Sequence, residues 1–227
     1  MIYPNHTLAR FLDRPNRFVA HVELGGNIET VHVKNTGRCK ELLLPDCEVV
    51  LTKSENSARK TAYDLIAVYK QNLGWANIDS QAPNHVTQEW LENKPDPFSD
   101  VTLIKPEYIF GNSRIDFYME SPSRRILLEV KGCTLEKDGI GYFPDAPTER
   151  GVKHLQELTA AAKDGYSCYI AFVIALPGVR EVRPNIDTHP EFGVALNQAA
   201  EAGVNILYLP CDVSPGSLKI IDVISGK

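Results

Sequence analysis

Short runs of alternating hydrophobic and polar residues dominate the first part of the chain. Residues 17–24 and 28–33 alternate on either side of a Gly-Gly-Asn turn, which is a strong β-hairpin signal. Three later runs have strand length and strand composition: 47–52, 62–69 and 75–78. Strands this short and closely spaced predict a small barrel. An OB-like barrel is the leading interpretation, and an open strand-rich subdomain is the alternative.

Helical spacing begins near residue 83, where Val86, Trp90 and Leu91 form an apolar stripe. The later elements are strands at 114–119 and 126–131, a loop at 139–147, a helix at 148–165, a buried strand at 169–175, a helix at 191–202 and a strand at 204–209. Strands interleaved with helices in this way indicate a mixed α/β sheet. We therefore expect a barrel domain at 1–80 and a mixed-sheet domain at 81–227.

The two strands at 114–119 and 126–131 carry the candidate chemistry. Side chains alternate along a strand, so Glu129 and Lys131 share one face while the two apolar neighbours share the other. A hairpin would bring Asp116 to the same surface. Two carboxylates beside an amine suit metal-assisted phosphodiester cleavage. We expect Asp116, Glu129 and the Val130 carbonyl to bind Mg²⁺ or Mn²⁺, and Lys131 to orient water.

A Glu-x-Lys pair alone usually marks a solvated strand face. The order strand with Asp, strand with Glu-x-Lys, helix, strand is more specific, because it resembles the core of PD-(D/E)xK nucleases. The helix at 148–165 would then lie beside the site. Its polar side carries Arg150, Lys153, His154 and Glu157. Arg150 and Lys153 are candidates for phosphate contacts. His154 fits a phosphate contact, a proton carrier or a surface position.

A second candidate site is the loop at 35–40, between two predicted barrel strands. Gly37 permits a backbone turn, and amides beside Lys34, Arg38 and Lys40 could hold a phosphate. The alternative is a purely structural turn, and the sequence leaves both open.

Three acidic residues have no assigned role. Glu89 lies on the helix before the hairpin, where some nucleases of this fold add a metal ligand. Asp145 lies in the Gly- and Pro-rich loop, and Asp187 precedes the helix at 191–202. For Glu89 a solvated position is the better interpretation. Asp145 would shape its loop, and Asp187 would either cap the helix or face the site.

Composition narrows the class of protein. The hydrophobic share of 43% and charged share of 23% are those of a globular chain. No apolar run is long enough to span a membrane, and the first residues lack a signal-peptide core. The five cysteines show no Cys-x-x-Cys pair, so we expect reduced thiols in a cytoplasmic protein and no zinc site. The net charge of −5 excludes a uniformly basic nucleic-acid binder, although residues 1–60 carry nine Lys or Arg against seven Asp or Glu.

Several longer stretches resemble the sugar fermentation stimulation protein A (SfsA) family. They are VKNTGRC at 33–39, SRIDF at 113–117, LEVK at 128–131 and GYFPDAPTERGVKHL at 141–155. This resemblance implies an N-terminal OB-like domain, a C-terminal nuclease-type domain, DNA binding and a link to sugar utilisation. The chain departs from the family where the Asn-Thr-Gly loop continues with Arg38-Cys39, which adds a positive charge and leaves the detailed role of the loop in doubt.

Three functions compete at this point. The first is a metal-dependent nuclease that binds DNA with little sequence specificity. The second is a non-catalytic DNA-binding regulator of carbohydrate metabolism genes, acting through phosphate contacts. The third is a small-ligand or protein-interaction module on the same scaffold. An intact Asp and Glu-x-Lys set favours the first. The sequence leaves the substrate, the cleavage polarity and the formation of a homodimer open.

Overall fold

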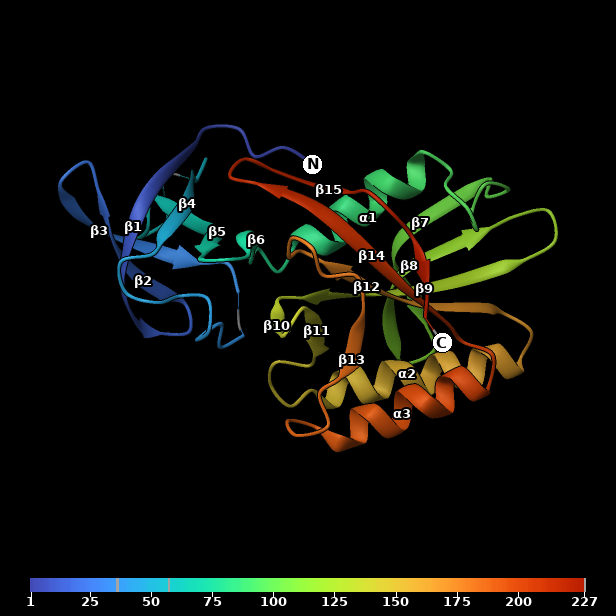
Figure 1. Ribbon diagram of the computed structural model, residues 1–227. Coiled ribbons are helices and arrows are strands. Elements are labelled where there is room, and N and C mark those ends of the chain that lie inside the picture. The colour runs from blue at the N-terminus through green and yellow to red at the C-terminus, as the bar shows by residue number, and fades with distance from the viewer. Residues whose placement is uncertain (36, 57, 227) are drawn as a thin grey trace.

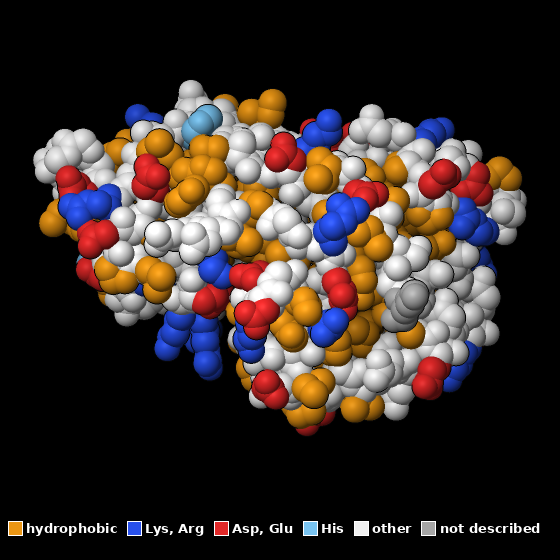
Figure 2. Space-filling model, viewed as in Figure 1, with side chains coloured by type: hydrophobic (Ala, Val, Ile, Leu, Met, Phe, Trp, Pro, Cys, Tyr) orange, Lys and Arg blue, Asp and Glu red, His pale blue; other side chains and the backbone are white. Residues whose placement is uncertain are grey.

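The computed structural model describes residues 1–35, 37–56 and 58–226. The chain forms an N-terminal barrel and a larger C-terminal α/β part, joined side by side (Figure 1). A space-filling view shows the two parts pressed together, with a notch at the lower edge of their junction (Figure 2). No helix among the described residues is long and apolar enough to cross a membrane.

The barrel is a closed OB-like barrel. Its strands are β1 (His6–Asn16), β2 (Val19–Leu24), β3 (Asn27–Val33), β4 (Glu48–Lys53), β5 (Tyr63–Lys70) and β6 (Gly74–Asn77). The strand order is β3-β2-β1-β4-β5-β6, and a parallel pairing of β3 with β5 closes the ring. The predicted barrel is therefore confirmed. The Gly-Gly-Asn turn joins β2 to β3 as expected, with both glycines at positive φ.

The C-terminal part is built on a mixed sheet of order β15-β14-β12-β9-β8-β7, with β16 paired to β14. Its strands are β7 (Leu103–Phe110), β8 (Ser113–Glu120), β9 (Arg125–Cys133), β12 (Ser167–Ile174), β14 (Asn205–Ser214), β15 (Ser217–Ile220) and β16 (Ile224–Ser225). β9, β12 and β14 run parallel, whereas β7, β8 and β9 form an antiparallel meander. β12 is almost wholly buried, which confirms the predicted central strand.

Within the described part of the chain, three helices cover the sheet: α1 (Ala82–Glu92), α2 (Glu149–Lys163) and α3 (Pro190–Glu201). α2 and α3 lie together on one face, and α1 lies on the other (Figure 1). The predicted start of α2 is confirmed, because the Thr148 hydroxyl accepts a hydrogen bond from the Gly151 amide at 3.1 Å.

The segment 139–147 was predicted as a loop, and this is wrong for its first half. Ile140–Phe143 is strand β11, which pairs with β10 (Leu135–Lys137) and, in parallel, with β13 (Val182–Pro184). The partner β13 is remote in sequence, so a local pattern could not reveal it. Six other strands of the described residues were also missed: β1, β7, β10, β13, β15 and β16. β1 contains register shifts that break its alternation, and β7 is a half-exposed edge strand containing Pro106.

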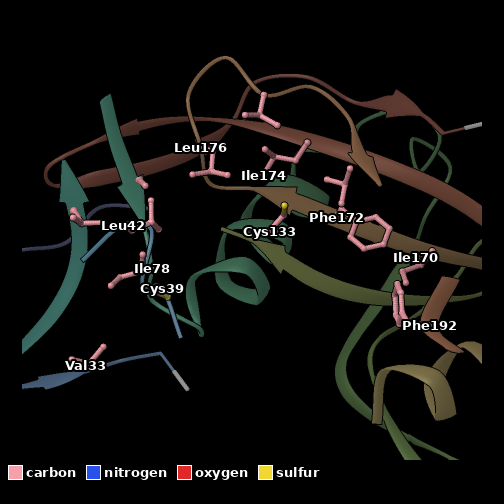
Figure 3. Close-up of a cluster of buried hydrophobic side chains, with 14 of the residues drawn as sticks. Val33, Cys39, Leu42, Ile78, Cys133, Ile170, Phe172, Ile174, Leu176 and Phe192 are labelled. Atoms are coloured by element: carbon pink, nitrogen blue, oxygen red, sulfur yellow. The ribbon is translucent and has the colours of Figure 1, made fainter. Parts of the chain in front are cut away.

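One continuous apolar cluster joins the two parts. Figure 3 shows side chains of this cluster from both parts: Leu42 and Ile78 from the N-terminal part, and Phe172, Leu176 and Phe192 from the C-terminal part. The Asn77 amide donates to the Ala175 carbonyl at 3.1 Å, and the Lys70 ammonium pairs with Glu136. A shared core of this kind fixes the barrel against the sheet.

The five cysteines are free thiols, as expected.

Candidate functional site

The candidate site lies where β8 and β9 separate. Their antiparallel ladder pairs Phe117 with Leu128 and extends from there toward the connecting turn. Beyond that pair the Asp116 side chain takes the role of a backbone partner, because its Oδ2 accepts the Val130 amide at 2.7 Å. Strand separation therefore presents a carboxylate between two strands without leaving the amide unpaired.

A helix residue holds the other oxygen of this carboxylate. Asn84, in the first turn of α1, donates through Nδ2 to Asp116 Oδ1 at 2.8 Å. α1 approaches β9 closely at Gly132, where an added Cβ would lie 2.8 Å from the Pro83 ring. The glycine thus permits the close packing that brings Asn84 to Asp116. Glu89, for which a solvated position is the better interpretation of the sequence, is indeed exposed and pairs with the N-terminal ammonium of Met1.

Glu129 lies on the opposite face of β9 from Val130, beneath α2. The residue is 1% exposed, and its Oε1 accepts hydrogen bonds from the Lys131 ammonium and from His154 Nδ1. The second oxygen, Oε2, is buried without a hydrogen-bond partner among the described residues. The Arg150 Nε group lies 3.3 Å from His154 Nε2, to which it donates. A chain of polar contacts therefore runs from the surface of α2 to a buried carboxylate.

Asp116, Glu129 and Lys131, which we call the acidic centre, influence one another electrostatically. Burial and the negative charge of Glu129 together raise the pKa of Asp116 from 3.8 to about 6. The hydrogen bonds from the Val130 amide and Asn84 and the charge of Lys131 lower this pKa, but they do not outweigh the first two effects. Burial alone would raise the pKa of Glu129 as well. The His154 hydrogen bond and the Lys131 charge outweigh it, so the pKa of Glu129 lies below its ordinary value. The centre thus holds one carboxylate that stays ionised and one whose pKa is about 6.

The donor set of the acidic centre suits a divalent cation only in part. No group of three or more His, Cys, Asp or Glu side chains among residues 1–35, 37–56 and 58–226 is arranged to hold a metal ion. The acidic centre supplies two carboxylates, and Glu129 Oε2 is an orphaned buried acceptor. Mg²⁺ commonly uses one or two carboxylates and completes its shell with water and substrate phosphate. The residues therefore fit a hard cation of this kind.

The predicted cations of the barrel loop separate into two environments. Lys34 is half-buried, and its ammonium pairs with the buried Asp79 carboxylate at 2.8 Å. Arg38 and Lys40 are exposed. Thr36 of the predicted loop lies outside the described residues. The loop contacts the C-terminal part through Asp145, whose Oδ2 accepts the Arg38 amide at 3.2 Å.

The three side chains of α2 that were predicted to bind nucleic acid differ in exposure. Arg150 and Lys153 are exposed. Lys153 donates to the Asn112 carbonyl at 3.2 Å and lies 3.7 Å from the Glu157 carboxylate. His154 is 3% exposed and faces Glu129, so it belongs to the interior of the site rather than to a phosphate-contacting surface.

Two functional contacts lacked a clear sequence signal. Asn84 was known only as a residue at the predicted helix start, and His154 as one polar position on a helix face. His154 lies on the same buried side of α2 as Leu155 and Leu158. Its position at the edge of this apolar stripe was the one feature of the sequence that could have indicated its burial. Asp187 is exposed and does not cap α3, whose N-cap is His189.

Family comparisons match both parts of the chain. A family model described as "SfsA N-terminal OB domain" matches residues 12–78, and one described as "Sugar fermentation stimulation protein RE domain" matches residues 81–217. The chain is 51% identical over 224 residues to a "Sugar fermentation stimulation protein homolog" of Clostridium beijerinckii, covering 99% of this chain and 98% of that protein. A homolog of the same description from Ruminiclostridium cellulolyticum is 52% identical over 220 residues, covering 97% and 96%.

A solved structure matches the whole arrangement. It is the structure of Pyrococcus furiosus SfsA in complex with Ca²⁺. The likeness has a TM-score of 0.80 and a sequence identity of 29%, and covers 99% of this chain and 95% of the other. Both the barrel and the mixed-sheet part therefore have counterparts in a single solved protein.

Proposed function

The chain belongs to the sugar fermentation stimulation protein (SfsA) family, and we propose that it is a DNA-binding protein whose acidic centre is a Mg²⁺- or Mn²⁺-dependent phosphodiesterase site. The observation that carries the proposal is the convergence of Asp116, Glu129 and Lys131, which belong to two strands, at the point where those strands separate. A charge cluster of this kind is costly to bury and is typical of functional sites.

Asp116 and Glu129 would hold the cation, together with the Val130 carbonyl. Glu129 Oε2 is the free acceptor of the pair, while its Oε1 is fixed by Lys131 and His154. The related protein from Pyrococcus furiosus was solved with Ca²⁺, another hard cation with a preference for oxygen ligands. When bound, such an ion supplies Lewis acidity toward a phosphoryl oxygen and lowers the pKa of bound water.

The protein groups have separate tasks in this proposal. Lys131 is 14% exposed and close to Glu129, so its ammonium can orient a water molecule and stabilise negative charge that develops on a phosphate. Asn84 holds Asp116 in place through its amide. His154 keeps Glu129 ionised and fixes its rotamer, which makes His154 a positioning residue.

Exposed cations on both parts would bind the DNA backbone. Arg38 and Lys40 lie on the barrel loop, and Arg150 and Lys153 on the first turns of α2. We keep Lys34 as a weaker candidate, because its charge is already paired with Asp79. Contacts to phosphates carry no sequence information, so little sequence specificity and a strong salt dependence are expected.

The second candidate is DNA binding without catalysis, in the regulation of carbohydrate use. One observation favours it. Both oxygens of Asp116 already accept hydrogen bonds from the protein, and Glu129 is 1% exposed. A centre closed in this way could serve structure alone.

Cleavage assays separate the two candidates. Single-stranded, duplex and branched DNA, and RNA, are incubated with Mg²⁺ or Mn²⁺ and either the wild type or Glu129→Gln. Glu136→Gln is the matched control, because Glu136 also pairs with a lysine but lies outside the centre. The nuclease proposal expects cleavage by the wild type and the control only. Binding without cleavage, unchanged by Glu129→Gln, establishes the second candidate.

A further inference from the structure

Three neighbouring cavities lead from the barrel loop to the acidic centre. The first, which we call the basic pocket, has a volume of about 460 Å³ and lies beside the loop at residues 37–40. The second, the junction cleft, has a volume of about 230 Å³ and is walled by both parts of the chain. The third, about 530 Å³, is lined by Asp116. Gly37 borders the first two cavities, and Ser80 and Asn84 border the last two, so each cavity adjoins the next.

The basic pocket is lined by four cations and, among the described residues, by no carboxylate. The cations are Arg14, Arg17, Arg38 and Lys40. None of them forms an ion pair with a described residue, although most other arginines of the chain do, such as Arg10 and Arg59. Four like charges in one hollow repel one another unless an anion joins them. In a chain of net charge −5 this concentration is local and specific. Figure 2 shows Lys and Arg side chains projecting beside the notch at the junction.

Arg14 gives the pocket a fixed shape before any ligand arrives. Its guanidinium donates to the Arg38 and Arg17 carbonyls, each at 2.7 Å, and to the Asn35 carbonyl at 2.9 Å. Its Nε group is buried and has no partner among the described residues. The loop that presents Arg38 and Lys40 is thereby tied to strand β1. A site preorganised in this way loses less conformational entropy when it binds.

We propose that the basic pocket binds a phosphate group of a single nucleic-acid strand, which continues through the junction cleft to the acidic centre. This inference rests on the proposed function, since it assigns the substrate of the same site. The volume of the junction cleft, about 230 Å³, is too small to hold a duplex, so a strand that follows the cleft must be unpaired. Asp145 and Phe143 line the cleft, and Asp145 holds the Arg38 amide at its entrance.

The test measures binding rather than cleavage. Fluorescence anisotropy with a labelled single-stranded oligonucleotide, at several salt concentrations and with EDTA, compares the wild type with Arg38→Gln/Lys40→Gln. Neutralising two phosphate contacts should lower the salt slope by about 1.4 and weaken binding about twentyfold near 0.1 M salt. Lys60→Gln/Lys163→Gln removes two exposed cations away from the pocket and should bind like the wild type. Both doubles change exposed side chains, and their thermal unfolding should match the wild type.

Each outcome has a defined meaning. A loss confined to the pocket variant, and larger for single-stranded than for duplex DNA, supports the proposal. Full competition by inorganic phosphate, with no dependence on oligonucleotide length, identifies a free-phosphate site and overturns the strand path. Equal binding by all proteins overturns the pocket. If the pocket variant loses binding while no protein cleaves DNA, the nuclease proposal fails and this one stands. If cleavage is lost in Glu129→Gln but the pocket variant binds normally, the nuclease proposal stands and the basic-pocket proposal fails.

Discussion

The Asp116 carboxylate accepts the Val130 amide at 2.7 Å and so replaces a main-chain neighbour at the point where β8 and β9 part. Because the carboxylate satisfies a backbone donor, its position is set by the sheet itself. The amide of Asn84 fixes the remaining oxygen. An acidic group is thereby held beside Glu129 by two hydrogen bonds, and the repulsion between the two carboxylates is contained by the fold.

Asp116→Asn should stabilise the protein at neutral pH when no divalent cation is present. The pKa of Asp116 rises from 3.8 to about 6 on folding, so the native state binds the proton more tightly than the unfolded state. The resulting stabilisation is complete below pH 3.8 and is lost as the pH rises through about 6. The pKa difference between the folded and unfolded states corresponds to at most about 3 kcal/mol in the free energy of unfolding. Urea unfolding of both proteins between pH 4 and pH 7.5 measures it.

A divalent cation should make the wild type more stable than Asp116→Asn at neutral pH. Mn²⁺ or Ca²⁺ would displace the proton from Asp116, so its stabilising effect should grow as the pH rises through about 6 and be absent in Asp116→Asn. Equal stabilisation of both proteins by the cation, at both ends of this range, would place the cation elsewhere.

His154→Phe should destabilise the protein by about 1–3 kcal/mol, because Glu129 loses a hydrogen-bond donor while it remains buried. The pKa of Glu129 should rise as a result, and the cost should therefore shrink at acidic pH. His154→Gln keeps a donor at this position and should recover part of the loss. Arg150→Gln, at the exposed end of the same chain of contacts, should have little effect. Guanidinium unfolding at two pH values distinguishes these effects. If His154→Phe is as stable as the wild type at both pH values, the coupling between His154 and Glu129 is refuted.

Lys131 and Glu129 should be energetically coupled. Lys131→Met removes the cation from a carboxylate with a 2% exposed side chain, and the expected loss is about 3–5 kcal/mol. Lys131→Met/Glu129→Gln removes both charges and should be more stable than Lys131→Met alone. A double-mutant cycle by urea unfolding gives the coupling energy. Simple additivity of the two single changes would mean that the ion pair contributes nothing.

Gly132→Ala should weaken the site through α1 rather than through the sheet. The new Cβ would lie 2.8 Å from the Pro83 ring, so the first turn of α1 must move and carry Asn84 away from Asp116. We expect a loss of about 1–3 kcal/mol in stability, together with weaker Mn²⁺ binding. Gly139→Ala, at an open turn, tests whether any glycine change has the same effect on Mn²⁺. Undisturbed Mn²⁺ affinity in Gly132→Ala would separate Asn84 from the site.

Much of the architecture could be predicted from local pattern. Alternation and the Gly-Gly-Asn turn identified the hairpin of β2 and β3, and the apolar run at 169–175 identified the central strand β12. The motifs at 128–131 and 141–155 identified the family, which the family models confirm. The face shared by Glu129 and Lys131 followed from strand alternation, and their ion pair confirms it.

The sequence by itself determined which residues are charged, where the helices and most of the longer strands lie, and that Glu129 and Lys131 lie on one face. Only the tertiary structure decided that His154 is buried against Glu129, that Asn84 contacts Asp116, and that Ile140–Phe143 pairs with a remote strand. Local periodicity records one element's preference for a buried face. It does not record which distant element supplies the partner, because that choice depends on packing between segments far apart in the chain.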